Sequence, residues 1–125
     1  MKLSANLGLL WSELPLLERV YKAKEKNFDA VEFQFPYEVD ANELKKAIDK
    51  INLPIIGINT IKGNVSKGDN GLNAVPSRVQ EARSAIDQAI EYAKVIGSKN
   101  IHFMCGITEQ NLSLIHISEP TRPLI

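Results

Sequence analysis

The feature that most constrains the fold is a strict alternation of short strand-like segments with amphipathic helical segments. Short apolar segments typical of strands occur at residues 3–7, 30–35, 54–58 and 100–104. Between them, apolar residues recur at helical spacing over residues 15–26, 40–51 and 77–96. Such an alternation predicts a parallel sheet covered by helices. Two closures are compatible with it, a doubly wound sheet and a (β/α) barrel.

Side-chain parity in the segment 30–35 favours the barrel. Alternate residues of a strand point to opposite faces, so Val31 and Phe33 share one face while Glu32 and Gln34 share the other. In a doubly wound sheet both faces lie under helices, and the second face would bury a carboxylate in the core. In a barrel that face points into the lumen, where a carboxylate can be hydrogen-bonded and solvated.

The same parity places a polar side chain near the carboxyl end of each predicted strand. These residues are Asn6, Glu32, Asn59 and His102. In barrel enzymes this end carries the chemistry, so we expect the four to line a substrate-binding pocket. Structural roles stay open for each: the asparagines could cap the following turn, Glu32 could be a hydrogen-bonded lumen carboxylate, and His102 could be a base, a metal ligand or a core histidine.

Arg78 is a fifth predicted substrate-binding residue. It follows the long segment from Thr60 to Pro76, and loops of this length are usually functional or disordered. A guanidinium at this position could hold the carboxylate of a substrate at the mouth of the pocket. The alternative is an ordinary surface salt bridge.

Composition excludes several classes of protein. Fifteen Lys and Arg residues balance fifteen Asp and Glu residues, so neither nucleic acid nor an anionic membrane surface is an expected partner. Cys105 is the single cysteine, which rules out an internal disulfide. The first residues lack the features of a signal peptide and no stretch is apolar enough to span a membrane, so a cytoplasmic protein is expected. Nucleotide-binding and zinc motifs are lacking, and no cofactor or metal is predicted for this chain.

Longer stretches of the sequence resemble the hydroxypyruvate isomerase family. The resemblance covers SANLGLLWSELPLLERVYKAKEKNFDAVEFQFPYEVD and GLNAVPSRVQEARSAIDQAIEYAKVIGSKNIHFMCG, from Met1 to about Gly106. One departure is Gly63-Asn64, where family members often have Gly-Asp. The motifs that carry the resemblance are SANL, VEFQFPY, NT and a proline–x–arginine, at Ser4–Leu7, Val31–Tyr37, Asn59–Thr60 and Pro76–Arg78.

The resemblance implies a fold, a reaction and a substrate class. The fold is a xylose isomerase-like (β/α)8 barrel. The reaction is the interconversion of hydroxypyruvate and tartronate semialdehyde, or of a related 2-oxo acid sugar, in carbohydrate and glyoxylate metabolism. In the family two glutamates do this work, often with a divalent metal held by carboxylates. Those residues belong to later strands, so no catalytic residue and no metal ligand is assigned within this chain.

The length predicts a partial barrel. A (β/α)8 barrel needs about 250 residues, whereas this chain has 125. Residues 1–111 are therefore expected to be the N-terminal half of a barrel, with about four βα units and no isomerase activity. The segment LSLIHISEPTR, from Leu112 to Arg122, matches the translation of a transposon-type sequencing adapter. Residues 112–125 are accordingly interpreted as a non-native tail.

Other functions remain open at this point. The parent could be another xylose isomerase-like enzyme, such as a sugar epimerase or a metal-dependent endonuclease. A balanced net charge does not favour the nuclease. The chain could also be a non-enzymatic α/β binding module. The sequence leaves the oligomeric state open.

Overall fold

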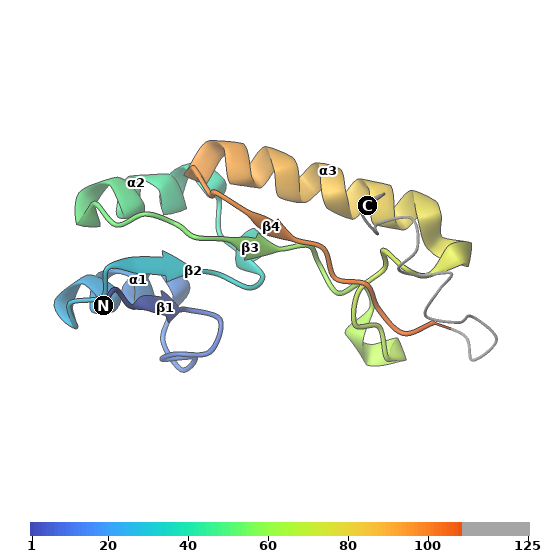
Figure 1. Cartoon of the computed structure of the whole chain (residues 1–125), viewed down its shortest axis with the longest axis horizontal. Helices are drawn as coiled ribbons and strands as arrows, with labels where there is room; N and C mark the ends of the chain where they lie inside the picture. Colours follow the sequence, from blue (N-terminus) through green and yellow to red (C-terminus); the bar gives the residue numbers. More distant parts are fainter. Residues whose placement is uncertain (109–125) are drawn as a thin grey trace.

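The computed structural model describes residues 1–108 and confirms the alternation of strands and helices (Figure 1). The predicted tail at residues 112–125 lies outside the described residues, so its interpretation stays a prediction. Three short 3-10 helices occupy the loops: η1 (Pro36–Glu38), η2 (Val65–Lys67) and η3 (Pro76–Arg78). The main elements in chain order are β1 (Ser4–Asn6), α1 (Leu16–Glu25), β2 (Ala30–Glu32), α2 (Ala41–Ile51), β3 (Ile58–Asn59), α3 (Val79–Ile96) and β4 (Ile101–His102).

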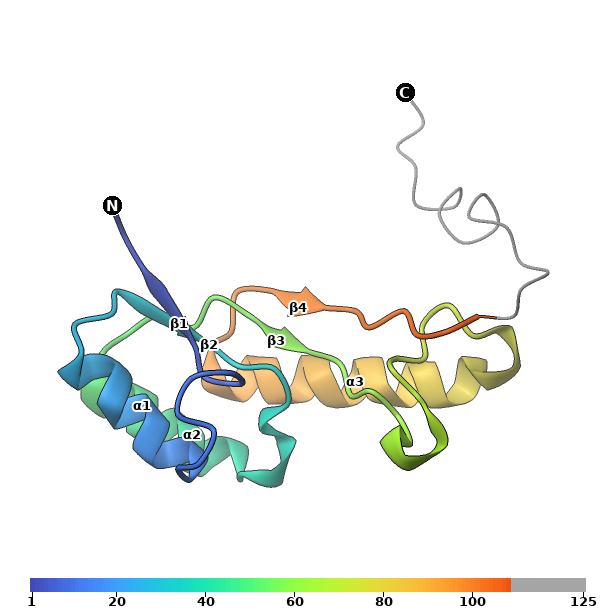
Figure 2. The ribbon, with the colours of Figure 1, turned by 90° about the horizontal axis from the view of Figure 1, so that it is seen from below.

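The strands lie in chain order and run parallel. β1 pairs with β2 and β3 pairs with β4, and an isolated parallel bridge between Val31 and Ile55 joins the two pairs. Figure 2 shows that α1, α2 and α3 all lie on the same side of these strands. A doubly wound sheet has helices on both faces, whereas successive βα units of a barrel place them on one. The predicted α/β class and partial barrel are confirmed.

The core lies between the strands and the helices, as side-chain parity predicts. Val31 is 0% exposed and Phe33 is 3% exposed, whereas Glu32 and Gln34 on the other face are half-buried. No helix within residues 1–108 has the length and apolar character needed to cross a membrane. The other large contributors to the core are Ala5, Leu7, Val20, Leu44, Ile48, Ile51, Ile55, Ile58, Ala89 and Ile96.

The third strand is less regular than residues 54–58 predict. In regular parallel pairing with β2, the backbone N–H of Phe33 would donate to the carbonyl of Ile56. In the structure this N–H donates instead to the carbonyl of the next residue, Gly57, at 3.0 Å. One residue is thus inserted, a β-bulge that turns both Ile55 and Ile58 toward the helices although they are three apart. The side-chain amide of Asn100 donates to the carbonyl of Ile56 at 2.9 Å, which satisfies that group.

The long loop between β3 and α3 is pinned beside the continuation of β4. Gly71 forms an antiparallel bridge with Cys105, and the N–H of Leu72 donates to the carbonyl of Met104 at 3.0 Å. Gly71 has a φ of 116°, and a Cβ there would lie 2.4 Å from the Met104 carbonyl. Only glycine fits this close approach, so the loop end is fixed next to the carboxyl ends of the strands.

Candidate functional site

A cavity of about 410 Å³ lies along the strands, and its lining includes Glu32 and Gln34, which parity places on the face opposite the helices. All four strands contribute to its lining, and each of the predicted strand-end residues takes part: Asn6, Glu32, Asn59 and His102. The amides of Gln34 and Asn100 also line it. The structure thus brings together the four polar residues that parity assigned to the lumen.

Pairing fixes the order of these side chains across the cavity. Asn6 is the register partner of Glu32, and Asn59 is the register partner of His102. Neighbouring strands lie about 4.8 Å apart, so the four side chains span three strand spacings, or roughly 14 Å. A three- or four-carbon acid is shorter than this span and can contact two or three of them at once.

Asn6 both caps a turn and lines the cavity. Its Oδ1 accepts a hydrogen bond from the backbone N–H of Gly8 at 3.0 Å, which confirms the turn-capping interpretation. Its amide nitrogen is the group that can donate to a ligand. A Cβ on Gly8 would lie 2.5 Å from Cγ of Gln34, so glycine lets the Gln34 side chain rest against this turn.

Glu32 and His102 are the titratable groups of the cavity within the described residues. Glu32 is half-buried and accepts a weak hydrogen bond from the Ser4 hydroxyl at 3.4 Å, while His102 is exposed. Oxygen-liganded divalent cations bind through several carboxylates or carbonyls. Residues 1–108 contain no group of three or more His, Cys, Asp and Glu that could hold a metal. The part of the chain that the structure describes therefore does not fit a divalent-metal centre.

The backbone of Asn59 is held on both sides. Its N–H donates to the carbonyl of Gln34 at 3.0 Å, and its carbonyl accepts a hydrogen bond from the hydroxyl of Tyr37. Sequence analysis did not single out Tyr37, although the tyrosine closes the VEFQFPY motif. Its position directly after the strand-ending Pro36 was the signal that could have identified it.

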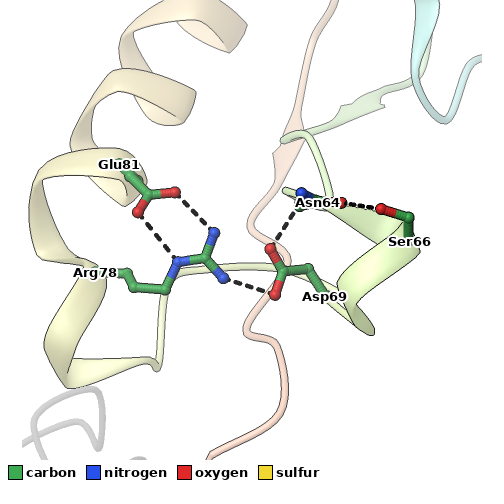
Figure 3. Close-up of polar contacts among 5 residues, drawn as sticks. All are labelled: Asn64, Ser66, Asp69, Arg78 and Glu81. Atoms are coloured by element: carbon green, nitrogen blue, oxygen red, sulfur yellow. Dashed lines mark hydrogen bonds and ion pairs between the residues drawn. The ribbon is translucent and has the colours of Figure 1, made fainter.

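Arg78 lies elsewhere, in a second cavity of about 990 Å³ between the long loop and α3. Its guanidinium contacts the carboxylate of Asp69 at 2.6 Å and donates to Glu81 at 2.7 and 3.2 Å (Figure 3). The hydrogen bond from Arg78 lowers the pKa of Asp69 and of Glu81 below their ordinary values. The structure does not bring Arg78 together with the other four predicted residues. Because two carboxylates take up its donors, the salt-bridge interpretation fits better than a substrate clamp.

Asp69 also closes the loop on itself. Its second carboxylate oxygen accepts a hydrogen bond from the backbone N–H of Asn64 at 2.6 Å, and the Ser66 hydroxyl donates to Oδ1 of Asn64 at 2.6 Å (Figure 3). The Asp69–Arg78 pair therefore ties the folded loop to the start of α3. Its role in this structure is to order the loop.

Arg19 orders the other loop beside the cavity. Its three guanidinium nitrogens donate to the carbonyls of Leu14, Leu7 and Ser12 at 2.7, 2.9 and 2.9 Å. These bonds fix the segment that connects β1 to α1 and leaves the strand directly after Asn6. This contact is not predictable from the sequence, because nothing in the local pattern distinguishes Arg19 from a solvent-exposed helical arginine.

Comparison with known proteins gives close relatives. The chain is 38% identical to a 2-oxo-tetronate isomerase of Haemophilus influenzae over 112 residues, which is 90% of this chain and 43% of the relative. It is 35% identical to the hydroxypyruvate isomerase of Escherichia coli over 113 residues, which is 90% of this chain and 44% of that protein. The chain thus spans less than half the length of these curated relatives.

A solved structure and a family model agree with these relatives. The crystal structure of a protein described as AP endonuclease, family 2, from Brucella melitensis superposes with a TM-score of 0.84 and 34% identity. The superposition covers 95% of this chain and 46% of that one. Residues 20–119 match the model of the family described as xylose isomerase-like TIM barrel. By fold, by pairing order and by sequence, the chain belongs to the xylose isomerase-like TIM barrel family.

Proposed function

We propose that this chain is the N-terminal half of an isomerase that acts on small hydroxy and oxo acids. Hydroxypyruvate, converted to tartronate semialdehyde, or a related 2-oxo-tetronate is the proposed substrate. The observation that carries the proposal is the convergence of Asn6, Glu32, Asn59 and His102 in one cavity at the strand ends. The substrates named for the Haemophilus influenzae and Escherichia coli relatives support this substrate class.

The cavity suits recognition of such a substrate. Amide nitrogens and oxygens of Asn6, Gln34 and Asn59 can bind hydroxyl and carbonyl oxygens, and His102 can donate to a carboxylate. An aldose–ketose isomerisation moves a proton between adjacent carbons, so a base must face the substrate while a second group stabilises the enediolate oxygen. Glu32 and His102 are the cavity residues that could take part in such a proton transfer, while the resemblance assigns the family's two catalytic glutamates to later strands.

The same geometry predicts that the chain alone has no isomerase activity. Glu32 and His102 belong to β2 and β4, with β3 between them. Glu32 is the one carboxylate that lines the cavity within the described residues, and catalysis by a single acid–base group would forfeit most of the expected rate. A second acid–base group from the remaining half of the barrel is required in our proposal.

The test measures binding and turnover separately. Hydroxypyruvate is titrated into the 15N-labelled chain while the NMR chemical shifts of the backbone amides are followed. We expect the largest chemical-shift changes at residues that line the cavity. Asn59→Ala should weaken binding about 2- to 13-fold, the equivalent of one hydrogen bond worth about 0.5–1.5 kcal/mol. Asn42→Ala, an exposed asparagine of α2, is the matched control and should leave binding unchanged.

Several results would contradict the proposal. The cavity does not bind this substrate if the amide chemical-shift changes fall on residues outside the cavity. The same conclusion follows if Asn59→Ala binds hydroxypyruvate as tightly as the Asn42→Ala control. Tartronate semialdehyde formation above a heat-inactivated sample, abolished by Glu32→Gln, would contradict the expected inactivity. Because the Brucella melitensis structure is described as an AP endonuclease, an oligonucleotide with an abasic site serves as the comparison ligand. Preferential binding of that DNA would favour the nuclease function, which the equal numbers of acidic and basic residues do not suggest.

A further inference from the structure

The peptide unit between Asn59 and Thr60 is held at both ends. Its carbonyl, on Asn59, accepts a hydrogen bond from the Tyr37 hydroxyl. Its N–H, on Thr60, donates to the carbonyl of His102 at 2.9 Å. Asn59 and His102 are register partners on β3 and β4, and both line the cavity. A single peptide plane therefore couples the positions of two candidate binding residues.

Nothing in the ladder between β2 and β3 would replace the Tyr37 bond. β3 ends at Asn59, and the β2 side already contributes the Gln34 carbonyl to the N–H of Asn59. The Thr60 side chain is turned the other way, with Oγ1 accepting from the N–H of Met104 at 2.9 Å, and Thr60 is 1% exposed. Without the Tyr37 hydroxyl, the partly buried carbonyl of Asn59 would lose its hydrogen-bond partner.

Tyr37 is itself held in place by a second tyrosine. The Tyr37 and Tyr92 rings meet edge to face, with centroids 5.2 Å apart and an interplanar angle of 73°. The Tyr92 hydroxyl lies 2.8 Å from the carbonyl of Pro36, the first residue of η1, and 2.7 Å from that of Val39, which follows η1, so it shares its proton between the two ends of this helix. α3 thereby fixes η1, and η1 presents Tyr37 to the end of β3.

We propose that Tyr37 is a positioning residue of the cavity, which sets the relative placement of Asn59 and His102 through the Asn59–Thr60 peptide. The inference rests on the proposed function only where it identifies the ligand as a small oxo acid. Burial raises the pKa of Tyr37 to about 12, so the phenol stays protonated as a donor throughout the physiological range. The positioning effect should therefore be the same from pH 5 to pH 9.

The test compares Tyr37→Phe with Tyr21→Phe in the 125-residue chain. Both variants keep the ring and lose one hydroxyl, but the Tyr37 hydroxyl contacts the cavity backbone, whereas Tyr21 is an exposed residue of α1. Tyr37→Phe should lower the exchange protection of the Thr60 amide about 2- to 13-fold relative to core amides, the equivalent of one hydrogen bond. Tyr21→Phe should leave the protection of the Thr60 amide unchanged.

Hydroxypyruvate affinity supplies the readout that a purely structural role would leave unchanged. Tyr37→Phe should weaken binding severalfold at every pH between 5 and 9, while Tyr21→Phe should bind like the wild type. If Tyr37→Phe keeps wild-type Thr60 protection, or if Tyr21→Phe lowers Thr60 protection to the same extent, the proposal is overturned. If the wild-type chain does not bind hydroxypyruvate, the proposed function fails. Selective loss of Thr60 protection in Tyr37→Phe would in that case still establish the positioning role.

Discussion

Two adjacent residues of β2 test which face of the strands carries the core. Val31 is 0% exposed and is paired on both sides, with Ala5 on β1 and Ile55 before β3. Its neighbour Glu32 points into the cavity and is half-buried. Val31→Ala and Glu32→Ala therefore change consecutive positions of the same strand, with opposite predicted consequences.

The magnitudes follow from burial. Val31→Ala removes two buried carbons, worth about 1.6 kcal/mol at about 0.8 kcal/mol each. The unfilled space adds about 1 kcal/mol, which gives a loss of about 2.5 kcal/mol in the free energy of unfolding. For a domain of this size, that corresponds to a fall in Tm of about 10–20 °C. Glu32→Ala removes no core contact, and its change should stay within about 0.5 kcal/mol.

Thermal and urea unfolding followed by circular dichroism measure both changes. The m-value should stay constant in each variant, so that the midpoint reports stability. Glu32→Ala should alter hydroxypyruvate binding without altering stability, and Val31→Ala should do the reverse in its folded fraction. A loss for Glu32→Ala as large as that for Val31→Ala would refute the assignment of the two faces, and with it the cavity.

Three further predictions concern the loops and a helix end. Asp40→Ala removes an N-cap side chain that accepts two backbone N–H groups of α2, and thermal unfolding should show a loss of about 0.5–2 kcal/mol. Because Asp69 and Glu81 have pKa values depressed below 3.8 and 4.5, their ion pairs stabilise the fold above those values. That contribution should be lost as pH falls below about 4, with the NMR shift of the Asn64 amide as the probe and Asp69→Asn as a variant that shows no such transition. Gly71→Ala should cost about 1–3 kcal/mol because of its positive φ and close backbone contact, and a wild-type Tm would contradict this.

Patterns with a fixed period were sufficient to predict the architecture and four of the cavity residues. The strand period of two identified Val31 and Phe33 as core and Glu32 as a cavity residue, because a regular strand leaves no other arrangement. The same rule was less accurate for residues 54–58. A bulge changes the parity, and its carbonyl is satisfied by Asn100 from a distant part of the sequence.

Contacts between residues far apart in the sequence could not be predicted in this way. Arg78 looks like a free cation from its position after a glycine-rich loop, and only the fold shows that Asp69 and Glu81 occupy its donors. Arg19 and Tyr37 bind backbone carbonyls, which every residue has, so the sequence contains no complementary partner to recognise. Such contacts depend on where the loops come together after folding.

The division between predicted and unpredicted residues reflects how a barrel builds a binding site. Strand-end side chains such as Asn59 and His102 reach the cavity because the sheet points them there, and the sheet is encoded by a repeating pattern. The residues that fix their precise placement come from the connecting segments, where no repeat applies. Tyr37 belongs to this second group: it lies outside the strands, yet one hydrogen bond from it reaches the peptide that links both binding residues. In a fold whose chemistry varies through its loops, the positioning contacts should therefore differ between relatives more readily than the strand-end residues that they support.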